Sequence, residues 1–208
     1  MMKEKILFMK DINSQKMDEF LEDLQAPVFP GPASGSACAV SVAMAAALLG
    51  MSVEATRKKK EVSGEDVPSA QQIYQWRQKS MELATKDMQA YDKVVKAQSL
   101  KKEEPDEYDR IMAEATVTLV EIMECSAEIL KSINSFLTVS FNKVIGDLAG
   151  AASLAYGAAI GCNGSVEINS KLIKGQEARA SIIRIKEDHL NGVNKSKSRI
   201  DQYLKSVI

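Results

Sequence analysis

The stretch at residues 30–51, PGPASGSACAVSVAMAAALLGM, decides the fold class of this 208-residue chain. A turn rich in Pro, Gly and Ser leads directly into a long run of Ala, Val, Leu and Met. The run leaves almost no polar stripe at helical spacing, so it predicts a helix, from residue 34 or 35 to 53, that is buried on all sides. Small side chains along such a helix let a second helix approach closely.

A second stretch of the same kind lies at residues 148–162, LAGAASLAYGAAIGC, inside a helix predicted over about 142–172. Both uninterrupted apolar runs are shorter than the roughly 20 residues that span a bilayer. Both are also dominated by Ala, Ser and Gly rather than by Leu and Ile. We therefore expect no membrane span, and we expect the two helices to form a central pair, in a bundle core or in a core shared between two chains.

The rest of the chain shows amphipathic helical periodicity and almost none of the alternation typical of strands. The apolar spacing predicts further helices over about 14–24, 67–98, 105–135 and 175–206. The sequence therefore indicates an all-α, single-domain helical bundle over residues 1–208.

Composition excludes several classes of function. Lys plus Arg (27) nearly balance Asp plus Glu (28), so no global field recruits nucleic acid or an anionic membrane. Three cysteines without CxxC spacing, and no long apolar segment behind the first lysines, indicate a reduced, cytoplasmic protein rather than a secreted one. Because His189 is the single histidine, zinc sites and histidine-based triads are hard to build, and we expect no metal.

Two candidate binding segments flank the first apolar helix. The turn ending in Gly35 and Ser36 places free backbone N–H groups at a helix N-terminus, which suits a carboxylate or phosphate, although a plain capping turn explains it equally. Lys58, Lys59 and Lys60 follow the helix C-terminus, where they relieve the negative helix end or attract a polyanionic ligand tail.

Candidate acid–base groups lie on other predicted helices. Asp87 and Tyr91 are one turn apart and share a face that can point into a cleft, or they are an exposed acid beside a core phenol. Asp147 stands at the entrance of the second apolar helix, as a cap or as an acid or base. Asn169, at the far end of that helix, needs a hydrogen-bond partner if it is buried.

In order along the chain, these segments resemble the cyclodeaminase/cyclohydrolase family of folate enzymes. The family's Asp-x-x-Ala-Tyr/Phe-x-x-Val motif matches in full at Asp87, Ala90, Tyr91 and Val94. Its Pro-x-Pro-Gly-Gly-Gly-Ser loop is kept at Pro30, Pro32, Gly35 and Ser36, whereas Ala33 and Ser34 replace two glycines. Its Lys-Lys-Lys resembles Lys58, Lys59 and Lys60.

Two further signatures of the family match in part. The segment before the second apolar helix, residues 140–147, keeps only the final acid, Asp147, and the closing segment, residues 165–169, keeps only its last residue, Asn169. Lys143 stands where the family has a neutral amide, and we expect it to form an ion pair with Asp147.

The resemblance implies a homodimer that binds folate in a cleft near the subunit contact, without metal or cofactor. It implies ring closure of 5-formimino-tetrahydrofolate to 5,10-methenyl-tetrahydrofolate with loss of ammonia, or hydrolysis of the methenyl compound. Asp87 and Asp147 would handle protons, Tyr91 would shape the pterin pocket, and Gly35, Ser36, Lys143 and Asn169 would contact the ligand. Lys58, Lys59 and Lys60 would attract its glutamate tail. Nothing in the sequence separates these two reactions. The alternative is a folate-binding or structural homologue that has lost catalysis through substitutions at motif positions: Ala33, Ser34, Phe141, Lys143, Gly146 and Ser165.

Overall fold

The computed structural model describes residues 11–26 and 30–207, and within these ranges every regular element is helical. The order along the chain is η1 (Ile12–Ser14), α1 (Met17–Gln25), α2 (Ser34–Arg57), α3 (Ala70–Lys96), α4 (Leu100–Glu103), α5 (Pro105–Leu137), η2 (Asn142–Val144), α6 (Ile145–Ser170) and α7 (Gln176–Val207). The all-α prediction is confirmed. Most of the N-terminal segment used to argue against secretion lies outside the described residues.

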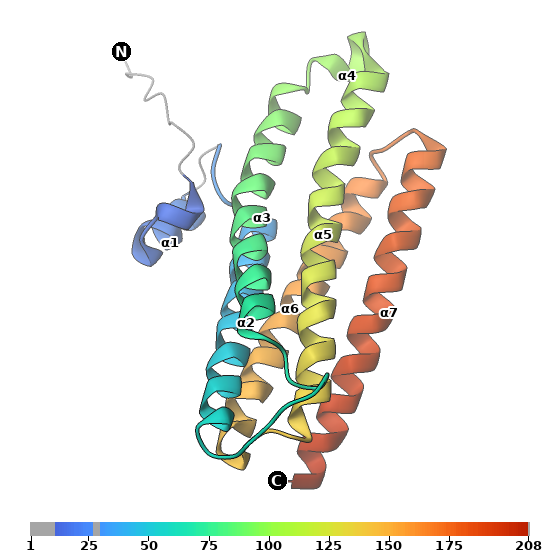
Figure 1. Ribbon diagram of the computed structural model, residues 1–208. Helices are drawn as coiled ribbons and strands as arrows, with labels where there is room; N and C mark the ends of the chain where they lie inside the picture. The colour runs from blue at the N-terminus through green and yellow to red at the C-terminus, as the bar shows by residue number, and fades with distance from the viewer. Residues whose placement is uncertain (1–10, 27–29, 208) are drawn as a thin grey trace.

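Five long helices, α2, α3, α5, α6 and α7, lie side by side as an elongated bundle, with the short α1 on its outside (Figure 1). Helices α2 and α6 are antiparallel. At one end the hydroxyl oxygens of Ser34 and Ser165 are 3.3 Å apart, and at the other the Phe141 N–H donates to Thr56 Oγ1 over 3.1 Å. The predicted central pair is therefore present.

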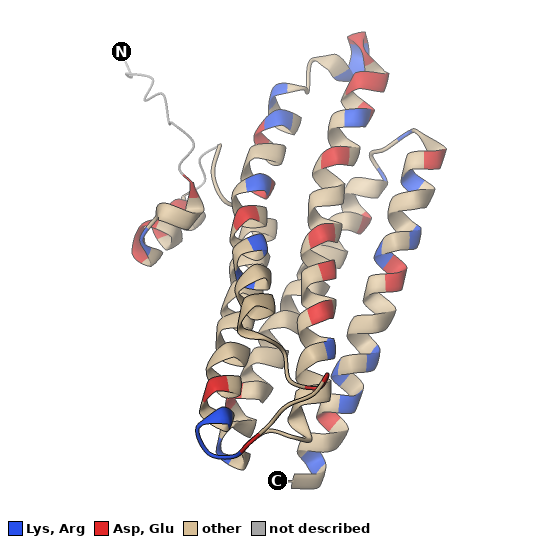
Figure 2. Ribbon diagram, viewed as in Figure 1, with Lys and Arg blue, Asp and Glu red and all other residues tan. Residues whose placement is uncertain are grey.

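Alanines make the close approach of α2 and α6 possible. Alanine is the most frequent fully buried residue of the two helices, at positions Ala39, Ala45, Ala46, Ala151, Ala152, Ala155 and Ala159. Charged residues instead gather on the outer helices and on the connections (Figure 2). The helices that pass through the bundle core are thus the ones with the fewest charges.

Burial on all sides, predicted for the first apolar helix, is wrong within one chain, and the second apolar helix is also open on one side. Met44 and Met51 on α2 are 41% and 44% exposed, and Ile160 and Ile168 on α6 are 40% and 65% exposed. The cause is that a sequence with no polar stripe does not distinguish burial inside a chain from burial against a second molecule.

By length and composition alone, two segments could cross a membrane: Ser34–Arg57, with hydropathy 1.9, and Asn142–Ser170, with hydropathy 1.4. Both belong to the central pair of the bundle, and core helices of this kind pass the same test. The expectation that the chain does not span a membrane therefore stays a prediction.

Local capping explains several helix boundaries and corrects others. Ser69 caps α3, because its side chain accepts the Gln72 N–H over 3.1 Å, so this helix begins at Ala70 rather than at residue 67. Pro105 starts α5, where its missing N–H costs nothing. The helix expected from about residue 14 begins later, because Ser14 belongs to η1 and α1 begins at Met17.

Candidate functional site

Asp87, in the second half of α3, is a carboxylic acid that is only 9% exposed. Its carboxyl group lies against the first turn of α2. Ser36 Oγ is 2.9 Å from Asp87 Oδ2 and also 3.0 Å from the carbonyl oxygen of Ala84. The backbone N–H of Ser36 also donates to the carboxylate. The sequence motif thus brings Asp87 to the end of another helix.

Gly35 makes this contact possible. A Cβ atom at position 35 would lie 2.2 Å from Asp87 Oδ1 and 2.5 Å from its Cγ, closer than any real Cβ contact. The absence of a side chain therefore creates the notch that the carboxyl group fills. The positive end of the α2 dipole, which the sequence offered to an external anion, faces the chain's own Asp87.

Burial governs the protonation of Asp87. Desolvation raises the pKa of this carboxyl, and the hydrogen bonds from the Ser36 hydroxyl and N–H lower it by less, so that the net pKa is raised. The Ser36 hydroxyl donates to Asp87 Oδ2 and to the Ala84 carbonyl oxygen, so its one hydrogen is shared between two acceptors.

Asp87 opens onto a cavity of about 420 Å³ formed by α2, α3, α5 and α6. This volume is within the range typical of small-molecule sites. Its lining residues include Gly35, Asp87, Tyr91 and Asn169, four of those that the sequence singled out. The remaining lining residues are Ala33, Ser34, Val94, Gln98, Tyr108, Met112, Ala115, Leu119, Ser165 and Leu172.

Helical spacing could have identified several of the lining residues that sequence reasoning missed. Gln98 lies two residues beyond the end of α3 and continues the helical spacing of Asp87, Tyr91 and Val94. Tyr108 begins a corresponding face of α5, and Gln98 Nε2 lies 3.4 Å from its hydroxyl. Their pairing across two helices depends on the tertiary packing, which no local pattern encodes.

The other predicted site residues lie at the opposite end of the bundle. Lys58, Lys59 and Lys60 are exposed after α2, where Figure 2 shows the run of cations. Lys143 is exposed in η2, and Asp147 is half-buried in the first turn of α6. At a helical rise of about 1.5 Å per residue, Asp147 is about 33 Å from Asn169 along α6.

The expected ion pair between Lys143 and Asp147 is not among the ion pairs of the described residues, so that prediction is wrong. Within one chain, the structure therefore brings Gly35, Ser36, Asp87, Tyr91 and Asn169 together. It separates them from the lysines and from Asp147.

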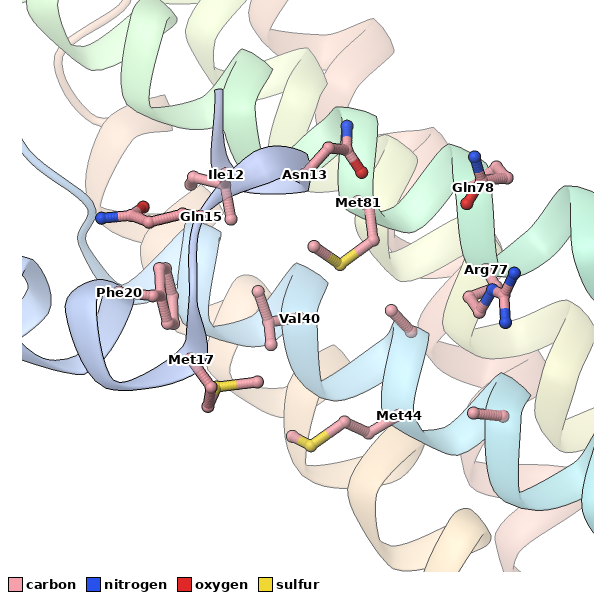
Figure 3. Close-up of a pocket in the computed structure, with 12 residues that line it drawn as sticks. Ile12, Asn13, Gln15, Met17, Phe20, Val40, Met44, Arg77, Gln78 and Met81 are labelled. Carbon is pink, nitrogen blue, oxygen red and sulfur yellow. The ribbon is translucent and has the colours of Figure 1, made fainter. Parts of the chain in front are cut away.

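A second cavity, of about 310 Å³, lies where η1 and α1 meet α2 and α3 (Figure 3). Met17, Phe20, Val40, Met44 and Met81 surround its apolar interior, with amide side chains and Arg77 at the rim. No Asp, Glu, His, Cys or Tyr is among its lining residues. This cavity therefore offers no acid or base near neutral pH, and the cavity at Asp87 is the candidate site.

The structure is an all-α bundle with a cavity of small-molecule size and a buried carboxylic acid at its edge. The formiminotransferase-cyclodeaminase family matches residues 16–187, and the chain belongs to this family. The fold is similar to that of formiminotetrahydrofolate cyclodeaminase from Thermotoga maritima, with a TM-score of 0.85 and 24% identity, covering 94% of this chain and 98% of that one. A comparison with curated proteins gives no match. The predicted family is confirmed.

Proposed function

We propose that this protein is a folate-converting enzyme that closes the ring of 5-formimino-tetrahydrofolate to 5,10-methenyl-tetrahydrofolate and releases ammonia. The observation that carries the proposal is the buried carboxyl group of Asp87, held against the start of α2 at the edge of a cavity of about 420 Å³. The reaction needs no metal or cofactor besides the folate substrate, and we place the enzyme in the cytoplasm.

The reaction requires positioning and proton transfer more than a protein nucleophile. The anilino nitrogen of the substrate attacks the formimino carbon, and the former imino nitrogen must gain a proton before it leaves as ammonia. Asp87 is suited to donate this proton because burial raises its pKa. When the proton leaves, the Ser36 hydroxyl can turn from the Ala84 carbonyl oxygen to Asp87 Oδ2 and stabilise the carboxylate.

The remaining lining residues fit a pterin and its linker. Tyr91 and Tyr108 offer aromatic surface, and Ser165, Asn169 and Gln98 offer polar groups for the heteroatoms of the ring edge. The cavity is not enclosed on all sides, so the benzoylglutamate part of the ligand can extend out of it.

We further propose that two copies form a homodimer through α2 and α6. Gly146, Gly150, Gly157 and Gly164 face open space on the exposed side of α6. Each glycine in an exposed helix destabilises it by about 1 kcal/mol relative to alanine, and nothing in a single chain offsets this cost. Close packing of a second helix against the glycines would offset it. The exposed Met44 and Met51 on α2 extend this face.

A two-fold axis across the middle of α6 would place the start of α6 from one subunit beside the end of α6 from the other. It would bring Asp147 of the partner subunit, together with that subunit's lysine run, toward the cavity that holds Asp87. The separation of the predicted site residues within one chain would then disappear in the assembly. Lys58, Lys59 and Lys60 could meet the glutamate tail of a folate bound to the other subunit.

Enzyme assays test the proposed reaction directly. The methenyl chromophore should appear when the protein is given 5-formimino-tetrahydrofolate, and should not appear with Asp87→Asn. Loss of the chromophore from 5,10-methenyl-tetrahydrofolate would instead identify a cyclohydrolase. Calorimetric binding of reduced folate without turnover of either compound would show a catalytically inactive homologue and contradict the proposal.

Mixed dimers test the shared site separately. Light scattering should first show a dimer. Asp87→Asn and Asp147→Asn should each be inactive alone, and co-expression should restore about a quarter of wild-type activity, because half of randomly formed dimers carry one intact composite site. Mixtures as inactive as the parents would show that the two acids do not meet across the subunits.

A further inference from the structure

Two thiols lie directly below the candidate site. Cys38 is one turn further along α2 than Ser34, and Cys162 is one turn before Ser165 on α6. Since the hydroxyl oxygens of Ser34 and Ser165 are 3.3 Å apart, the next turns of the two antiparallel helices must also face each other. The cysteines therefore occupy the next level of the same helix contact.

Close packing confirms this placement. A Cβ atom at Gly161 would lie 2.8 Å from Cys38 Sγ, so the sulfur lies against the backbone of α6 next to Cys162. The two thiols share a hydrogen bond. Cys162 is fully buried, whereas Cys38 is half-buried.

We propose that Cys38 and Cys162 are a redox modification site, at which hydrogen peroxide produces a reversible disulfide that joins α2 to α6 within one chain. The third cysteine, Cys125, is on α5 and takes no part. The proposal does not rest on the folate reaction, and its failure would leave that reaction untouched.

The environments of the two thiols assign their roles. The hydrogen bond from Cys162 lowers the pKa of Cys38, outweighing burial and the charge of Asp87, which raise it. The same hydrogen bond, burial and the negative charges of Cys38 and Asp87 raise the pKa of Cys162. Because Cys38 is half-buried and Cys162 is fully buried, Cys38 is the thiol that attacks peroxide, and Cys162 is the thiol that resolves the product.

The chemistry balances with peroxide as the only oxidant. The Cys38 thiolate attacks one peroxide oxygen, the O–O bond breaks, and the departing hydroxide takes a proton and becomes water, leaving a sulfenic acid on Cys38. The Cys162 sulfur then attacks the Cys38 sulfur and the S–O bond breaks. The departing hydroxide accepts the Cys162 proton, so two thiols and one peroxide give one disulfide and two water molecules.

Thiol counting by mass spectrometry tests the proposal. After peroxide treatment and alkylation in denaturant, the wild-type protein should have lost two free thiols, which dithiothreitol restores, and a peptide map should join Cys38 to Cys162. Cys125→Ser should lose the same two thiols. Cys162→Ser should instead accumulate a sulfenic acid on Cys38 that dimedone traps.

Three outcomes would overturn the proposal: a wild-type protein whose thiols all survive peroxide, oxidation that falls on Cys125, or a disulfide that joins two chains on a non-reducing gel. Circular dichroism verifies that each variant is folded.

Discussion

The two ends of the α2–α6 pair treat charge in opposite ways. At the start of α2, one carboxylic acid is buried, held by Ser36 and fitted against Gly35. At the other end, Lys58, Lys59 and Lys60 are exposed to water. At the first end, the neighbouring atoms set the protonation of the buried carboxyl group. At the second end, the exposed lysines act over distance and tolerate substitution. Proton transfer is therefore to be sought at the first end, and attraction of a ligand at the second.

Asp87→Asn tests the chemical end and should have the largest effect. Asparagine keeps the shape of the side chain but cannot donate an acidic proton, so kcat should fall by about 10²–10⁴-fold, the usual contribution of a general acid or base. Rates of methenyl formation by stopped-flow absorbance would measure it. A variant with wild-type kcat would show that Asp87 is only structural.

Gly35→Ala should have the next largest effect, on the fold itself. The added methyl group would collide with the Asp87 carboxyl, and overpacking of this kind costs about 1–3 kcal/mol of unfolding free energy. Gly192→Ala is the matched control, because Gly192 lies on α7 with open space beside it and should gain up to about 1 kcal/mol. Urea unfolding of both variants would show opposite signs if the notch is real.

Ser36→Ala should remove about 1 kcal/mol, the value of one buried hydrogen bond. Without this hydroxyl the pKa of Asp87 should rise further, so the alkaline limb of the pH–rate profile should move to higher pH. Ser41→Ala is the control, since Ser41 donates only to the Ala37 carbonyl within α2. Equal profiles for both variants would contradict the assigned role of Ser36.

The pH dependence of stability gives a smaller but sharper comparison. Because the folded protein raises the pKa of Asp87, the folded state binds this proton more tightly than the unfolded chain. The contribution of this proton to the free energy of unfolding is therefore complete below the pKa of Asp87 in the unfolded chain, about 3.9. It is lost as the pH rises through the pKa of Asp87 in the folded protein. Relative to Asp87→Asn, the wild type should lose unfolding free energy over this interval, and a constant difference would show that the pKa is not raised.

Replacing Lys58, Lys59 and Lys60 together by Gln should have the smallest effect. Exposed substitutions of this kind change stability by about 0.5 kcal/mol or less, so urea unfolding should be unaltered. If these lysines meet a glutamate tail, KM should rise for a polyglutamylated folate and stay constant for the monoglutamate. Salt should weaken the same preference. Equal KM values for both substrates in the wild type and the variant would remove the lysines from the site.

Much of the fold follows from local patterns. The apolar spacing located α2, α3, α5, α6 and α7 to within a few residues, because amphipathic periodicity and proline at a helix start are local signals. The short α4 was missed, since its segment, LKKE, is charged and lies before a proline. The open faces of α2 and α6 were also missed, because Met44 and Ile168 are equally apolar whether a partner or water covers them.

The candidate site was only partly predictable, for a different reason. The motif around Asp87 named an acid and a phenol on one face, and the structure places both at the cavity. No sequence pattern indicates that Gly35 leaves space for a carboxyl group from another helix. The sequence placed Asp147 and Asn169 at opposite ends of one helix, but it did not indicate which end lies beside Asp87. Distances between elements come from packing, which the sequence specifies only through the whole chain.

The hydroxyl of Ser36 has a consequence for the speed of the proposed cycle. Only one O–H bond must rotate when Asp87 releases its proton, while every heavy atom around it keeps its place. Side-chain rotations of this size take picoseconds to nanoseconds. Rotation of this hydroxyl should therefore not limit the rate of the proposed cycle.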